Sequence, residues 1–183
     1  MRRNYLTLSI LSVALVAAMS LSASSVALAQ RDAGAKARGE IGTGFWTNQR
    51  AARRMQHALD YSKGIYEYSR DAKEVQGKIA EKESAELGRN IEAAKNEVSA
   101  IRKEYGDDKN VQASLKAIEE HLSAAATQHE KLHAECQSDQ VDSSKTMECC
   151  NTITKELEKA IAEHAALMRQ LGIDKKAAST KAE

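Results

Sequence analysis

Apolar residues that recur at alternating steps of four and three positions constrain the fold of this chain more than any other feature. The pattern is clearest from Val111 to Cys136, where it is interrupted only by His129. Such steps keep one stripe of a helix facing a packing partner. The sequence also contains no proline and only 4% aromatic residues, which is atypical of β-rich folds. We therefore predict an all-α protein.

Four segments carry this pattern, and the connections between them are short. The predicted apolar stripes run over Ala58–Val75, Ile79–Tyr105, Val111–Cys136 and Cys150–Leu171. The turns are expected at Gln76-Gly77, at Gly106-Asp107-Asp108 and over residues 138–145. Amphipathic helices joined in this way predict an antiparallel up-down four-helix bundle over residues 47–173. A helical hairpin that dimerises into a four-helix assembly is the alternative.

The first 29 residues predict a cleavable signal peptide. A basic start at Arg2 and Arg3 precedes an apolar stretch, and Ala27-Leu28-Ala29 provides the small residues of a cleavage site. We expect a periplasmic or secreted protein with no integral membrane segment after cleavage. Residues 30–46 are expected to form a flexible arm whose Phe45-Trp46 pair tucks against the core, and residues 174–183 a disordered tail.

Charge and motifs exclude several functions. The 27 basic and 26 acidic residues nearly cancel, which argues against a nucleic-acid binder. No nucleophile elbow, P-loop or dinucleotide fingerprint occurs, and we predict that the protein is not an enzyme. Glu-x-x-His occurs once, at Glu130 and His133, which disfavours a di-iron bundle, and the low aromatic content disfavours a haem pocket.

Histidines and cysteines on the apolar stripes are the strongest functional signal. His129, His133 and Cys136 are spaced i, i+4 and i+7, so they project within about 60° of one helix face. If the hairpin turns back around residues 140–144, Cys149 and Cys150 lie opposite them. Imidazole and thiolate are ligands of Zn, Cu and Ni, so this group is the first-choice metal site. Met147 is a possible soft additional ligand.

A disulfide is an equally open interpretation of the same thiols. The predicted signal peptide would direct the chain to an oxidising compartment, where Cys136 can pair with Cys149 or Cys150. Such a bond would close the helical hairpin without any metal.

The second-choice metal site combines histidines from three helices. The assumed hairpin places His121 opposite His164, and the up-down topology brings His57 to a similar level. Met55 and Met168 are its possible soft partners. The sequence therefore predicts an exported bundle that binds a transition metal for sequestration, delivery or sensing. The alternative is a non-catalytic structural or interaction bundle, clipped by a disulfide, whose partner is an envelope protein or a second copy.

Overall fold

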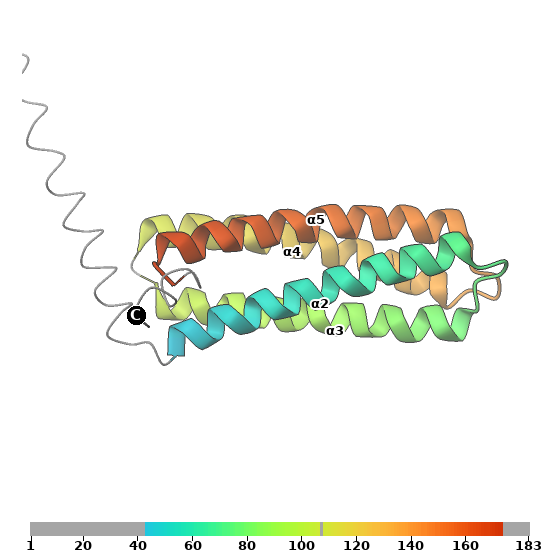
Figure 1. Ribbon diagram of the computed structural model, residues 1–183, viewed down its shortest axis with the longest axis horizontal. Helices are drawn as coiled ribbons and strands as arrows, with labels where there is room; N and C mark the ends of the chain where they lie inside the picture. The colour runs from blue at the N-terminus through green and yellow to red at the C-terminus, as the bar shows by residue number, and fades with distance from the viewer. Residues whose placement is uncertain (1–42, 107, 174–183) are drawn as a thin grey trace, which may run out of the picture. The chain divides into compact units, whose positions relative to one another are not determined.

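The computed structural model describes residues 43–106 and 108–173. These residues form four helices and no strand: α2 (Thr43–Asp71), α3 (Gly77–Glu104), α4 (Lys109–Cys136) and α5 (Ser143–Gln170) (Figure 1). The predicted signal peptide, most of the predicted arm and the predicted tail lie outside the described residues.

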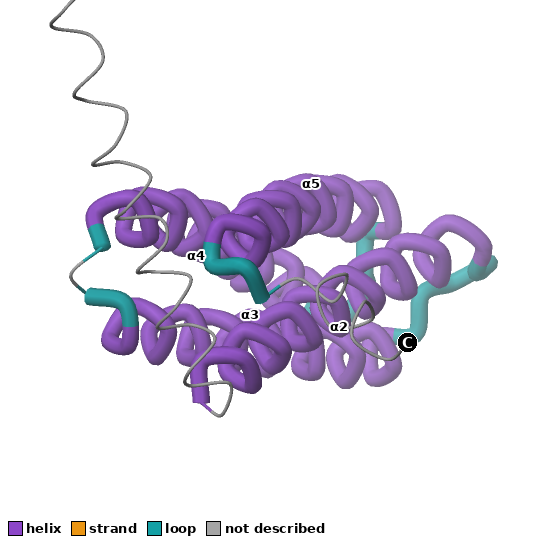
Figure 2. Tube along the Cα trace, turned by 60° about the vertical axis from the view of Figure 1, so that its left-hand side comes forward, coloured by secondary structure: helices purple, strands orange, loops and turns teal. Residues whose placement is uncertain are grey.

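The helices form an antiparallel up-down bundle, as predicted. Each helix packs against its neighbours in sequence, and α5 returns to pack against α2, which closes the ring (Figure 2). The α2–α3 and α4–α5 connections lie at one end of the bundle and the α3–α4 connection at the other (Figure 1). None of the described helices is long and apolar enough to cross a membrane.

The helix ends follow local chemistry. The carboxylates of Asp108 and Asp142 accept hydrogen bonds from N–H groups in the first turns of α4 and α5, at 2.9 Å in each case for the nearer group. These side chains satisfy backbone donors that have no partner within the helix. Gly172 follows α5 with a φ of 67°, a conformation that favours glycine at a helix end.

The core is built from the predicted apolar stripes. Its largest fully buried side chains come from all four helices, including Met55, Leu87, Leu115 and Leu157. Burial of such side chains stabilises a fold by about 1.5–3 kcal/mol each. The buried hydroxyl of Ser62 donates a hydrogen bond to the carbonyl of Cys150 on α5, whereas the buried hydroxyls of Ser69 and Thr146 have no hydrogen-bond partner among the described residues.

Four expectations for the first two helices were wrong. The first helix begins at Thr43 rather than at residue 47 and ends at Asp71 rather than Val75. Trp46 therefore lies inside α2, packs edge-to-face on Phe45 and is 53% exposed instead of covering the core. Ile79 is 42% exposed, because it lies in the first turn of a new helix where the stripe of α2 no longer continues.

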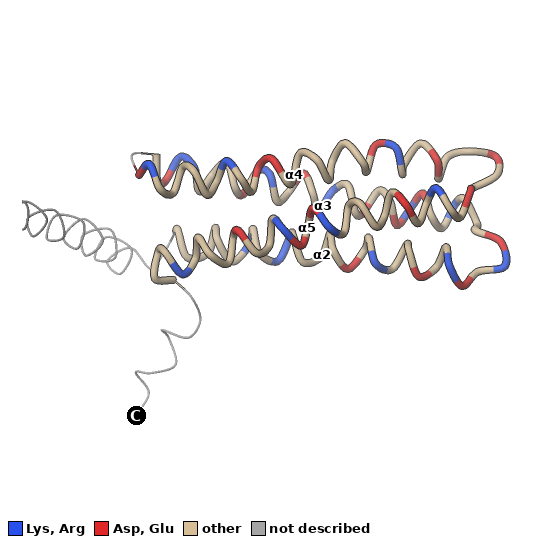
Figure 3. Tube along the Cα trace, turned by 90° about the horizontal axis from the view of Figure 1, so that it is seen from above, with Lys and Arg blue, Asp and Glu red and all other residues tan. Residues whose placement is uncertain are grey.

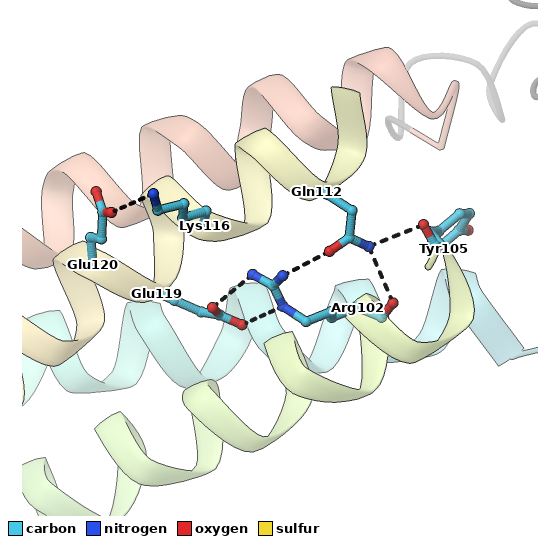
Figure 4. Close-up of polar contacts among 6 residues, drawn as sticks. All are labelled: Arg102, Tyr105, Gln112, Lys116, Glu119 and Glu120. Carbon is cyan, nitrogen blue, oxygen red and sulfur yellow. Dashed lines mark hydrogen bonds and ion pairs between the residues drawn. The ribbon is translucent and has the colours of Figure 1, made fainter. Parts of the chain in front are cut away.

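A polar network joins α3 to α4 near their connection (Figure 4). The Arg102 guanidinium donates to both carboxylate oxygens of Glu119, at 2.9 and 2.7 Å, and to the Gln112 side-chain oxygen at 2.7 Å. The Gln112 amide donates back to the carbonyls of Arg102 and Tyr105 at the end of α3. Elsewhere along the bundle, basic and acidic residues are interspersed (Figure 3).

Candidate functional site

The antiparallel packing of α4 on α5 brings all three cysteines of the chain to one end of the bundle. Cys136 ends α4, and Cys149 and Cys150 lie in the first half of α5. All three are free thiols; Cys136 and Cys150 are buried, and Cys149 is half-buried. A negative charge on one thiol raises the pKa of another, so the three groups lie close enough to interact.

Burial keeps these thiols protonated. It raises the pKa of Cys136 to about 11 and that of Cys150 to about 12, although a hydrogen bond involving Ser62 opposes the shift of Cys150. Burial, followed by the charge of Glu148, also raises the pKa of Cys149. Because the thiolate is the nucleophile, this environment does not suit nucleophilic catalysis.

Cys149 connects this thiol group to the protein surface. It lines a hollow of about 380 Å³ between α4 and α5, which a metal ion or thiol reagent can reach from solvent. The other lining residues are polar or charged: Gln128, Lys131, Glu135, Lys145, Glu148 and Thr152.

His129 and His133 form a separate pair that faces α3. Their rings stack with centroids 5.8 Å apart. His129 Nε2 lies 2.8 Å from the carbonyl oxygen of Ser84, to which it donates, and each ring has a nitrogen 3.4 Å from the Ser84 hydroxyl. Gly88 makes room for this contact, because a Cβ there would lie 2.7 Å from His129 Nε2. His129 is thus packed against α3 and hydrogen-bonded to it.

The structure does not assemble the first-choice group of His129, His133, Cys136 and Cys150. The imidazoles contact α3, whereas Cys150 lies beside Ser62 of α2. Among the described residues, no group of three or more His, Cys, Asp or Glu side chains is arranged to hold a metal ion. His129, His133 and Cys136 spread over about 60° of the surface of α4, so residues at the two edges of this arc can contact different neighbouring helices.

The second-choice histidines are also apart. His57 is exposed on α2. His121 Nδ1 lies 2.7 Å from Glu156 Oε2, and His164 Nε2 lies 3.2 Å from Asn48 Oδ1 inside the bundle. The expected pairing of His121 with His164 was wrong because the α4–α5 connection covers residues 137–142, earlier than assumed, which changes the register.

Burial and ion pairing account for the electrostatics of these groups. Burial lowers the pKa of His129 and lowers that of His164 to about 4, so both imidazoles are neutral at pH 7. Hydrogen bonds from Lys159 and then from His121 lower the pKa of Glu156.

Sequence reasoning did not find the polar partners of the histidines. Ser84, Gly88 and Asn48 receive or accommodate the imidazoles, and Ser62 lies beside Cys150. A weak signal was present, because serine and glycine at inward-facing positions of a helix are unfavourable unless a neighbour uses them.

The protein is thus an all-α four-helix bundle with two buried thiols and one half-buried thiol at one end. The chain matches no protein-family model, and comparison with curated proteins and with solved structures gave no match.

Proposed function

We propose that this protein is an exported bundle that binds a thiophilic transition metal, Cu(I) in preference to Zn or Ni, through Cys136, Cys150 and Cys149, which must move closer together on binding because the described residues hold no preformed metal cluster. The observation that carries the proposal is the convergence of every cysteine in the chain on one end of the bundle. Thiolates are soft ligands that favour Cu(I), whereas structural Zn sites take four ligands and this group offers three. Sequestration, delivery and sensing are all compatible with such a site.

The environment of the thiols supports this role. Two of the three sulfur atoms belong to buried residues, away from water and competing ligands, and Cys149 gives access from the surface hollow. Because the thiols are protonated in the free protein, metal binding releases protons and weakens as the pH falls. His129, His133, His121 and His164 are hydrogen-bonded to protein groups, so the cysteines are the more available ligands.

Metal retention tests the proposal directly. The reduced, purified protein is incubated with Cu(I) without oxygen, desalted and analysed by elemental mass spectrometry. We expect about one copper per chain, lost in Cys136→Ser and in Cys150→Ser. His129→Ala and His57→Ala are matched controls that retain copper. Reduced wild-type protein that retains no copper contradicts the proposal.

The same thiols support one competing function, a disulfide-clipped interaction bundle. Cys136 of α4 lies close enough to Cys149 and Cys150 of α5 for their charges to interact, and a bond between the two helices would clip the hairpin. It would stabilise the fold by about 2–4 kcal/mol. Peptide mapping of the protein isolated without reductant distinguishes the two. Complete oxidation of Cys136 together with no copper retention favours the interaction bundle.

The proposed export depends on the first 29 residues. Mature protein recovered from the periplasm or the medium should begin at Gln30, which N-terminal sequencing determines. Full-length protein in the cytoplasm would contradict this part of the proposal.

A further inference from the structure

One outer face of the bundle carries both large apolar side chains that are strongly exposed among the described residues. These are Trp46 on α2 and Ile79 at the start of α3. Trp46, His57 and Tyr61 share one face of α2, because their spacing follows the period of a helix. Exposed apolar side chains that share a face indicate an interaction surface.

The second half of this face is a groove with an acidic rim. The groove lies between α2 and α3 and has a volume of about 430 Å³. Its walls are mainly apolar and aromatic, and both charged residues that line it are acidic. The lining residues are Asp60, Tyr61, Gly64, Ile65, Tyr68, Ile79, Ala80 and Glu83.

Packing within the chain does not explain why residue 64 is a glycine. It lies inside α2, where glycine costs about 1 kcal/mol relative to alanine. A Cβ at this position would meet no atom within 4 Å, in contrast to Gly88, which accommodates His129. The missing side chain therefore leaves space in the groove for a group from another chain.

The first half of the face has the opposite charge. Residues 43–59 contain three arginines and no acidic residue. Arg50 is paired with Glu97 of α3 and Arg54 donates to Asn90 Oδ1 of α3 at 3.4 Å, while both Arg53 and Arg54 remain exposed. One half of the face thus offers an exposed tryptophan with basic neighbours, and the other half offers an apolar groove with an acidic rim.

When a second copy packs against this face in the antiparallel direction, the basic half of each copy lies opposite the acidic groove of the other. We propose that the protein forms a two-fold symmetric homodimer in which α2 of one copy packs antiparallel on α2 of the other. Trp46 then lies against the second copy's groove near Tyr68, Arg54 faces Asp60, and Arg50 crosses over Gly64. A two-fold interface repeats each of these contacts, which explains why one face carries both halves. The inference is independent of the metal proposal.

Oligomeric state and charge reversal test the dimer. Sedimentation of the wild-type protein over a concentration series should show a monomer–dimer equilibrium. Trp46→Ala and Ile79→Ser should each raise the dimer Kd at least tenfold, because buried aromatic and aliphatic anchors dominate interfaces. Arg54→Glu and Asp60→Arg should each weaken the dimer, and the double variant should restore it. The matched control is the exposed pair Lys116 and Glu120 on α4, whose reversal should leave the dimer Kd unchanged.

The antiparallel register makes a second, independent test. His57 lies at the two-fold axis, so His57→Cys should form a disulfide between copies, whereas the exposed control Lys116→Cys should not. Circular dichroism verifies that each variant remains helical. A monomer at every concentration overturns the proposal and leaves the groove for a different partner. A dimer that neither Trp46→Ala nor the charge reversals weaken also overturns it.

Discussion

His164 and Asn48 lie 116 residues apart and meet inside the bundle, with His164 Nε2 3.2 Å from Asn48 Oδ1. The Asn48 amide nitrogen donates to the carbonyl of Gly44 at 2.8 Å, so its oxygen is the acceptor for the imidazole N–H. This hydrogen bond joins the beginning of α2 to the end of α5. It therefore helps to hold α5 against α2, and the imidazole of His164 that makes it can be protonated.

The buried imidazole makes stability depend on pH. Its pKa is lowered to about 4 in the folded protein, against 6.5 for an unperturbed histidine. Between these values the unfolded chain binds more protons, so stability is greatest above pH 6.5 and falls as the pH decreases towards 4. The shift corresponds to about 3 kcal/mol. Urea unfolding at pH 7 and at pH 4.5 measures this loss.

Two variants isolate the contribution of His164. His164→Leu removes the titrating group, so its stability should decrease less between pH 7 and pH 4.5 than that of the wild type. Asn48→Ala is the control, because it keeps the buried imidazole and hence the pH dependence, while lowering stability at pH 7. Equal pH dependence in His164→Leu and the wild type would contradict the assignment.

The fold was predictable from the sequence because each helix carries its own information. The stripe of α4, from Val111 to Cys136, and the turn at Gly106-Asp107-Asp108 are set locally, and α4 begins directly after Asp108, as predicted. Boundaries that depend on tertiary contacts were less accurate. Trp46 resembles a core residue in composition, yet whether it is covered depends on what packs against α2.

Gly88 should be intolerant of a side chain even though it lies in a helix. Alanine is favoured over glycine in helices by about 1 kcal/mol, but a Cβ at residue 88 would lie 2.7 Å from His129 Nε2. The ring is held by its hydrogen bond to the Ser84 carbonyl, so it cannot move without losing that bond. We expect Gly88→Ala to destabilise the fold by about 1–3 kcal/mol, as overpacking does. Chemical denaturation measures the change.

The matched control for this substitution is Gly64, which also lies inside a helix but is exposed. Gly64→Ala meets no atom within 4 Å, so it should stabilise the monomer by about 1 kcal/mol. Combining Gly88→Ala with His129→Ala should recover much of the loss, because the clash is removed. Equal effects of alanine at residues 64 and 88 would show that His129 does not lie against Gly88.

The network around Arg102 should matter more than a simple surface ion pair. Arg102 contacts Glu119 with two nitrogen atoms and also orients Gln112 towards the carbonyls at the end of α3 (Figure 4). Arg102→Ala should cost about 1 kcal/mol, since both charged side chains are partly exposed. Arg102→Lys should not restore it, because an ammonium lacks the paired geometry. The control Lys116→Ala removes a 3.8 Å ion pair and should change thermal stability within about 0.5 kcal/mol.

The candidate site was only partly predictable. Spacing placed the three cysteines at the same end of the bundle, because a helical hairpin brings together residues on either side of a short connection. Spacing did not predict that His129 and Cys136 would have different neighbours, because those neighbours depend on where α3 and α2 lie around α4. An error of a few residues in the α4–α5 connection was enough to replace His164 by Glu156 as the partner of His121.

The reactivity of the thiols tests the arrangement of the cysteines. In the reduced protein at pH 8, a chromogenic aromatic disulfide should react quickly with Cys149, which lines the surface hollow, and slowly with Cys136 and Cys150, which are buried. Burial raises the pKa of Cys136 to about 11 and that of Cys150 to about 12, so few thiolates form. Cys149→Ser should abolish the fast phase, and unfolding in urea should expose the remaining thiols. Equal rates at all three cysteines in the native protein would contradict the structure of this end of the bundle.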